Sequence, residues 1–380
     1  MANLFTLPPL TLYIHIPWCE KKCPYCDFNS HVAQTIPEDE YIQALLRDAQ
    51  SQVELVQGRE ISSIFIGGGT PSLFKASSIA FLLDALSKTF HFSSDIEITM
   101  EANPGSSEQA KFAALKQAGV TRLSIGVQSF RDAQLGALGR VHCADEAHKA
   151  IKAAQFAGFD RINVDLMHGL PQQSEAMALA DLQYAIDAGI RHISWYQLTI
   201  EQNTAFFRDP PLLPVEDTLA NIQDRGFELL QKHGFVQYEV SAFAKPGQEA
   251  QHNINYWQFG DYLAIGAGAH GKITLPAQEQ VMRFNNTRTP KDYLARGDDF
   301  VAQTQHLSRD ELIFEYLMNA LRLIDGVETA QFSQRTGISL EELKAHCQAM
   351  IDKRLLRIDE RICTTDLGFR YLNSVLESLL

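Results

Sequence analysis

The sequence lacks the features that mark secreted, membrane-spanning and nucleic-acid-binding proteins. It has no apolar run near the ~20 residues that a membrane helix needs, and its start, MANLFTLPPL, has neither the basic region nor the long apolar core of a signal peptide. Lysine and arginine number 33 against 46 aspartate and glutamate residues, and this net charge of −13 disfavours nucleic acid as a partner. Six cysteines in 380 residues do not form a disulfide framework. We therefore expect a cytoplasmic protein whose thiols stay reduced and available to metals.

Three of the six cysteines fall close together in the stretch HIPWCEKKCPYCDFNSH. Cys19, Cys23 and Cys26 are separated by three residues and then by two. A structural zinc ion takes four ligands, so a zinc site here would recruit a histidine such as His15 or His31. An iron–sulfur cubane held by three thiolates leaves one iron open for another ligand. The residues alone leave both kinds of site open.

Short apolar strands alternate with amphipathic helical segments through the first two-thirds of the chain. The expected strands are 10–16, 61–66, 96–100, 122–127, 161–167 and 192–198. The expected helical segments are 38–57, 79–90, 112–118, 143–157, 174–188 and 216–233. Near-continuous apolar strands separated by helices indicate an α/β fold with a parallel sheet of six strand–helix units.

Polar and glycine-rich stretches follow the predicted strands. The cysteine loop follows the first, and later strands end in GGGTP (67–71), EANPG (101–105), VQSF (127–130) and DLMHGLP (165–171). Such residues also mark ordinary turns. Because five stretches follow five strands, we expect them to share one functional face at the C-terminal ends of the strands.

The pattern changes near residue 305. Ser308 with Glu311 and Ser339 with Glu342 are candidate capping boxes. Helices, two short strands around a turn and a last helix predict a winged-helix-like α+β domain, which we expect to pack as a lid because its basic residues do not outnumber its acidic ones.

Three parts follow from these patterns. Residues 1–245 should form the sheet domain with the cysteine site. Residues 246–304 should form a connecting segment with the HNINYW motif, and residues 305–380 the C-terminal helical, winged-helix-like domain.

The three-then-two cysteine spacing after a first strand, with Tyr25 between the last two thiolates, resembles the radical S-adenosylmethionine (SAM) superfamily. This resemblance implies a partial (β/α)6 radical SAM barrel, in agreement with the six units above. It also implies a 4Fe-4S cluster bound by Cys19, Cys23 and Cys26, with SAM chelating the open iron. One electron from such a cluster can cleave SAM to a 5′-deoxyadenosyl radical.

The resemblance also implies SAM contacts at the strand ends. Glycines of the GGGT motif would let the backbone approach the methionine group. Glu101 suits its ammonium, Arg140 its carboxylate and Asp165 the ribose hydroxyls. The implied contacts are Tyr13, Tyr25, Gly68, Gly69, Thr70, Glu101, Gln128, Arg140 and Asp165.

Nearly the whole chain resembles the family of the oxygen-independent coproporphyrinogen III dehydrogenase (HemN) and its HemW-type relatives, which are heme chaperones. The dehydrogenase has a further cysteine two residues after the third cluster cysteine, where this chain has Phe28. It also has a longer N-terminal extension, whereas only twelve residues precede Tyr13 here. The motif HNINYW (252–257) fits the HemW-type pattern. These three features favour the HemW type.

The HNINYW motif offers candidates for heme binding. His252 has an imidazole that can ligate heme iron, and Tyr256 and Trp257 can pack against a porphyrin face. A buried histidine beside two core aromatics is the competing interpretation. Less well supported histidines are His31, His142, His168 and His270.

Two functions remain in competition. The first is a heme chaperone that transfers heme to apo-hemoproteins, with the cluster and SAM controlling transfer or dimerisation. The second is radical SAM decarboxylation of coproporphyrinogen III in porphyrin biosynthesis, which the absence of the further cysteine disfavours. The sequence leaves open whether the chain is an enzyme. It also leaves open a homodimer and peripheral membrane contact through recipient proteins.

Overall fold

A twelve-stranded sheet dominates the structure, a computed structural model that describes residues 5–105 and 109–379. Residues 1–4 and 380, at the ends of the predicted first and last domains, lie outside the described residues. Six neighbouring strands of the sheet run parallel to one another. They are β1 (Leu10–Ile16), β4 (Ile61–Gly68), β5 (Phe92–Ala102), β6 (Arg122–Gln128), β7 (Arg161–His168) and β8 (His192–Gln197).

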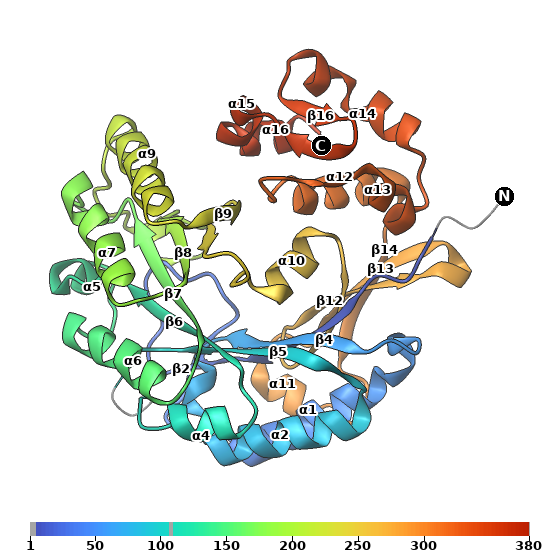
Figure 1. Cartoon of the computed structure of the whole chain (residues 1–380). Helices are drawn as coiled ribbons and strands as arrows, with labels where there is room; N and C mark the ends of the chain where they lie inside the picture. Colours follow the sequence, from blue (N-terminus) through green and yellow to red (C-terminus); the bar gives the residue numbers. More distant parts are fainter. Residues whose placement is uncertain (1–4, 106–108, 380) are drawn as a thin grey trace.

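Helices follow these strands and cover the outside of the curved sheet (Figure 1). They are α1 (Glu38–Ser51), α2 (Ala76–Thr89), α4 (Phe112–Gln117), α6 (Ala144–Phe156), α7 (Glu175–Asp187) and α9 (Glu216–Lys232). The six predicted strand–helix units are therefore present. Gly119 follows α4 at a φ of 105°, so it ends that helix in a conformation that favours glycine.

Side chains alternate along the parallel strands between two different environments. One set is apolar, is fully buried and belongs to the main core cluster; it includes Leu12, Ile14, Ile64, Ile66, Met100, Leu123, Ile125, Val164, Leu166 and Ile193. The intervening set is polar and lines a cavity on the other side of the sheet: Thr99, Glu101, Ser124, Asn163, Asp165, His192 and Ser194. The expectation of near-continuous apolar strands is therefore wrong for the inner face, because that face surrounds a polar cavity instead of a packed core.

The segment 246–304 extends the sheet and is more than the connection that the sequence predicts. Helix α10 (Gln251–Trp257) leads from β10, beyond β8, to β11, which pairs in parallel with β1 on the other side of the six strands. The added strands are β11 (Asp261–Ile265), β12 (His270–Leu275), β13 (Gln280–Asn286) and β14 (Val301–His306). At the opposite edge lie two short antiparallel strands, β9 (Val236–Glu239) and β10 (Ala242–Ala244).

The C-terminal region has its own hydrophobic core and a three-stranded sheet, β15-β17-β16. Its helices are α12 (Arg309–Ala320), α13 (Thr329–Thr336), α14 (Leu340–Asp352), α15 (Asp366–Arg370) and α16 (Leu372–Glu377), and its strands β15 (Val327–Glu328), β16 (Leu356–Ile358) and β17 (Arg361–Thr364). This is the predicted winged-helix-like order.

Two helices of this region begin at the predicted serine caps. Ser308 and Glu311 form a reciprocal capping box. Ser339 accepts from the backbone of Glu342, whose carboxylate pairs instead with Arg309. None of the helices in the described ranges is both long and apolar enough to cross a membrane.

A buried ionic cluster fixes the added strands to the sheet. Asp261 at the start of β11 accepts from Arg59 at 2.7 Å and from Lys272 of β12 at 2.9 Å. The backbone N–H and hydroxyl of Thr274 each donate to the same carboxylate at 2.8 Å. Burial alone would raise the pKa of Asp261, but Lys272 and Arg59 hold it below its usual value.

Replacing Asp261 by Asn should destabilise the protein strongly, because it leaves Lys272 buried without its counter-charge. We expect the free energy of unfolding to fall by about 3–5 kcal/mol in urea titrations followed by tryptophan fluorescence. The matched control is Asp84→Asn, which removes an exposed pair with Lys88 and should change stability by less than about 1 kcal/mol. If the two substitutions lowered the free energy of unfolding equally, Asp261 would not be the residue that fixes the added strands.

Candidate functional site

The three clustered cysteines line one cavity at the C-terminal ends of the parallel strands. Cys19 ends the short strand β2 (Trp18–Cys19), which pairs with β3 (His31–Val32), and Cys23 and Cys26 lie in the loop between these strands. All three thiols are free and half-buried. The cavity that they line has a volume of about 290 Å³. Burial raises the pKa of the Cys19 and Cys26 thiols.

The arrangement of the cysteines fits a cluster better than a single zinc ion. No three ligating side chains within residues 5–105 and 109–379 are placed to hold one metal ion. His15, a candidate fourth zinc ligand, has both ring nitrogens engaged, with the Tyr13 hydroxyl at 2.7 Å and the Asn29 carbonyl at 2.9 Å. Thiolates that bind different irons of a cubane need not converge on one point.

The glycine motif holds the backbone of β4 against the start of the cysteine loop. A Cβ atom on Gly69 would lie 2.4 Å from the Trp18 carbonyl oxygen, and one on Gly68 would lie 2.4 Å from the His15 ring. Gly68 also has a φ of 112°. The N–H groups of Gly69 and Thr70 donate to Ile16 and Trp18 at 2.7 Å. Only glycine fits these two positions, and Gly68, Gly69 and Thr70 line the cysteine cavity.

Two half-buried carboxyl groups face the same cavity. Glu101, near the end of β5, accepts from the Gly68 N–H at 2.9 Å, and Asp165 on β7 accepts from Ser124 at 3.2 Å and Asn163 at 2.8 Å. Burial and the neighbouring Asp165 raise the pKa of Glu101 to about 7. Burial also raises the pKa of Asp165. Within the described part of the chain neither carboxylate has an ion-pair partner, so these two side chains suit a cationic group of a ligand, although Arg140 lies in the same cavity.

Arg140 joins the cysteine loop to the strand ends. Its guanidinium donates to Asn103 and to the Gly126 carbonyl, both at 2.8 Å, and lies 3.6 Å from the Cys23 sulfur. Its Nε is buried and has no partner among the described residues. Gln128, at a φ of 70°, accepts from the Tyr196 hydroxyl at 2.9 Å.

The cavity therefore brings together most of the residues that the sequence predicts. They are Cys19, Cys23, Tyr25, Cys26, Gly68, Gly69, Thr70, Glu101, Gln128, Arg140 and Asp165. Sequence reasoning missed Asn103, Ser124 and Tyr196, which line it too. The sequence contained a signal for Ser124. Alternate residues of a strand point to the same face, and Ser124 lies two residues before Gly126 and four before Gln128 on β6.

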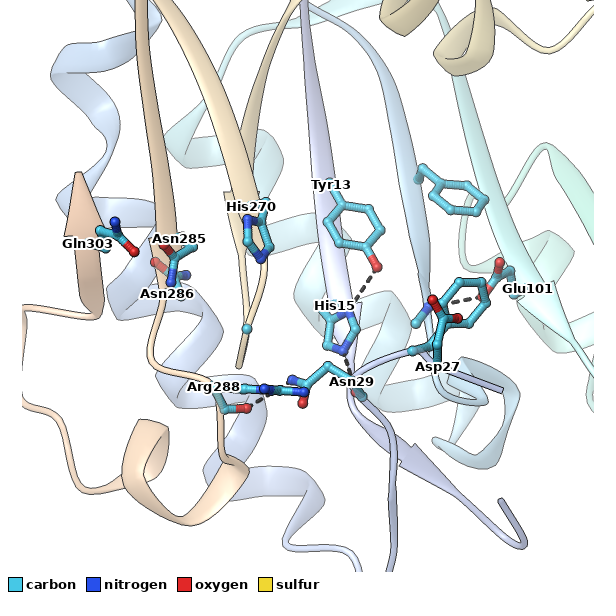
Figure 2. Close-up of a pocket in the computed structure, with 14 residues that line it drawn as sticks. Tyr13, His15, Asp27, Asn29, Glu101, His270, Asn285, Asn286, Arg288 and Gln303 are labelled. Carbon is cyan, nitrogen blue, oxygen red and sulfur yellow. Dashed lines mark hydrogen bonds between the residues drawn. The ribbon is translucent and has the colours of Figure 1, made fainter. Parts of the chain in front are cut away.

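Tyr13 lies in a second, adjoining cavity of about 670 Å³. Its ring stacks on Phe65. Figure 2 shows Tyr13 and His15 on β1 opposite His270, Asn285 and Gln303 of the added strands. The two cavities share Phe28, Gly68 and Glu101 in their walls. Phe28 is 60% exposed.

The HNINYW motif forms α10 and lies outside both of these cavities. His252 is buried, stacks on Phe65 with ring centroids 4.3 Å apart and places Nδ1 3.7 Å from the Glu97 carboxylate. Tyr256 packs edge-on against His252, whereas Trp257 lies under the guanidinium of Arg322 at the C-terminal core. The structure thus separates Trp257 from His252 and Tyr256. Heme binding by this motif stays a prediction.

Comparisons with known proteins agree with this arrangement. The family model described as the radical SAM superfamily matches residues 13–185, and the HemN C-terminal domain matches residues 307–371. The proteins named heme chaperone HemW from Haemophilus influenzae and Escherichia coli are 48% and 46% identical, each over 98% of this chain and 98–99% of their own length. The structure of Escherichia coli coproporphyrinogen III oxidase (HemN) matches 100% of this chain and 91% of that chain with a TM-score of 0.82 at 22% identity.

A cysteine triad beside a glycine motif, at the C-terminal face of six β/α units, defines a radical SAM protein with a partial barrel. Within that superfamily, the full-length similarity shows that the chain belongs to the HemW family. The superfamily's cofactors are a 4Fe-4S cluster and SAM. The site fits them, because it offers three thiols, two carboxylates without counter-cations and an unpaired Arg140 Nε.

Replacing Cys19 by Ser should abolish formation of a complete cluster, because serine removes one of only three thiolate ligands. We expect loss of the broad brown absorption and of most bound iron and sulfide after anaerobic reconstitution. Cys143→Ser is the matched control, because Cys143 is exposed and lies outside the cavity. A full cluster in the Cys19 variant would show that the ligand set is wrong.

Proposed function

We propose that the chain binds heme and transfers it to apo-hemoproteins, and that it does so with a 4Fe-4S cluster and SAM bound beside the heme. The observation that carries this proposal is the similarity, over nearly the whole length of both chains, to proteins named heme chaperone HemW. Phe28 supports it, because a phenyl ring cannot replace the ligand chemistry of the thiolate that the decarboxylating relatives have at this position.

The cluster and SAM would occupy the cysteine cavity. Cys19, Cys23 and Cys26 would hold three irons, and when bound the cluster supplies the electron that can cleave SAM. Arg140 keeps Nε available for the methionine carboxylate. Its position 3.6 Å from Cys23 also offsets the negative charge of that thiolate.

The remaining polar groups orient the bound cofactor. Glu101 would accept from the methionine amino group, and the close-packed glycines Gly68 and Gly69 and the hydroxyl of Thr70 would shape the adjacent wall. Asp165 would accept from the ribose hydroxyls. Gln128 and the ring of Tyr25 would close the adenosine side, where Tyr25 packs near Phe206.

The partners of this function are heme and the recipient apo-hemoproteins. We place the transfer in the cytoplasm, where the six free thiols stay reduced. A homodimer, and peripheral membrane contact made through recipient proteins, belong to the same proposal.

The second candidate is oxygen-independent coproporphyrinogen III dehydrogenation. The observation in its favour is the fold shared with HemN, including the C-terminal domain. A likeness at 22% identity supports the fold alone. The lack of the further cysteine weighs against this reaction.

SAM binding should strengthen as the pH rises through the pKa of Glu101. The carboxylate is protonated below about pH 7 and charged above it, and only the charged form attracts the ammonium. We expect SAM affinity of the reconstituted protein to rise about tenfold between about pH 6 and pH 8. Glu101→Gln should remove most of this dependence in equilibrium dialysis, whereas the exposed control Glu60→Gln should keep it. An identical slope in Glu101→Gln would refute the role of Glu101.

The two candidate functions are separated by one pair of assays. The reconstituted wild-type protein should bind about one heme per chain and release it to an apo-hemoprotein, because the family relatives are heme chaperones. It should not decarboxylate coproporphyrinogen III under anaerobic conditions with SAM and reductant. Sustained formation of protoporphyrinogen would favour the second candidate, and failure to bind heme would refute the first.

A further inference from the structure

The adjoining cavity has the size and the wall chemistry of a ligand site. Its volume of about 670 Å³ falls within the range of roughly 300–1,000 Å³ that is typical of small-molecule and cofactor sites. Phe28, Phe65 and Tyr13 supply aromatic surface on one side. Asn285 and Gln303, from the added strands, supply amide groups on the other side (Figure 2). A flat, largely apolar ligand with polar edge groups suits such walls.

His270 is the histidine of this cavity whose ring is free to bind a ligand. It begins β12, is exposed to the cavity and forms no side-chain hydrogen bond among the described residues. Partial burial, with Arg283 and Arg288 nearby, lowers its pKa, so the imidazole is neutral near pH 7 and keeps a lone pair. His15, the other histidine of the wall, is held at both ring nitrogens by Tyr13 and Asn29.

Arg288 brings a positive charge to a cavity whose wall also contains the acidic side chains Asp27 and Glu101, and it forms no ion pair within the described residues. Its guanidinium is exposed at the rim, while its backbone carbonyl accepts from Asn29 at 2.8 Å. Asn29 also donates to the Ala267 carbonyl at 2.9 Å, which fixes the cysteine loop to the segment before His270. A guanidinium in this position is suited to a carboxylate of the ligand.

We propose that heme binds in this adjoining cavity, with His270 as an axial iron ligand and Arg288 as the partner of a propionate. The assignment rests on the proposed function. A porphyrin there would lie next to Phe28, so one edge would be separated from the SAM cavity by the wall that contains Phe28, Gly68 and Glu101.

The sequence-based candidate His252 is less suited to this role. Its ring is sandwiched by contacts to Phe65 and Tyr256, and its Nδ1 faces Glu97, which also pairs with Arg122. Burial would raise the pKa of Glu97, but His252 and Arg122 hold it at about 2. The cavity that His252 lines has a volume of only about 130 Å³, which is below the range typical of cofactor sites.

Ferric heme titration of the full-length, cluster-reconstituted protein tests the assignment. Wild type, His270→Gly, His270→Ala and His252→Ala are compared by Soret absorption and by electron paramagnetic resonance of the heme iron. His270→Ala should change the iron spectrum and weaken binding at least about tenfold. His252→Ala should keep the wild-type spectrum. Added imidazole should restore the wild-type spectrum to His270→Gly, which a purely structural role for His270 would not allow.

Arg288→Gln tests the propionate contact with a second ligand. Wild type should bind heme about tenfold more tightly than heme dimethyl ester, because the ester lacks the carboxylates. Arg288→Gln should bind both alike, and cluster content and circular dichroism should show that the variant is folded.

An unchanged heme spectrum in His270→Ala, with heme still bound by wild type, overturns the assignment and leaves the proposed function intact. Failure of wild type to bind any heme overturns the proposed function as well.

Discussion

The buried carboxylate of Asp261 is the interaction on which the rest of the architecture depends. It holds β11 beside β1 through Arg59 and binds β12 through Lys272. Lys272 also lies over the ring of Phe259, 4.1 Å from its centroid, and Phe259 belongs to the C-terminal core. One carboxylate thus ties the first strand of the barrel, the added strands and the C-terminal region together. The wall of the adjoining cavity exists because these strands stay in place.

Each of the two cavities contains charged side chains of both signs. The cysteine cavity contains Glu101 and Asp165, which suit a cation such as the sulfonium and ammonium of SAM. The adjoining cavity has Arg288 at its rim, which suits an anion. Phe28 lies in the wall between them, where the decarboxylating relatives have a cysteine. The carboxylates that would bind SAM and the guanidinium that would bind a propionate are therefore different side chains, although Glu101 lies in the walls of both cavities.

The local parts of this structure could be predicted from the sequence, and the long-range parts could not. Cysteine spacing, the glycine motif and the strand-end residues depend on neighbours in the chain, and the cavity gathers Cys19, Gly68 and Glu101 as expected. The partner of Thr11 is Asp261, 250 residues away, so no local pattern marks 246–304 as part of the sheet. The burial of His252 on α10 depends on Phe65 of β4 and Glu97 of β5. The ring of His270 is likewise free because no described side chain hydrogen-bonds to it, which no local sequence pattern reveals.

The pairing of β1 with β11 has a consequence for how the chain folds. Contacts between residues so far apart in the chain form slowly, because a long loop must close first. During synthesis β1 emerges early and its partner late, so one edge of β1 has unpaired backbone groups until most of the chain has been made. The cysteine loop begins two residues after β1. The loop that receives the cluster gains the contacts of Asn29 with Ala267 and Arg288 only after β11 has been made.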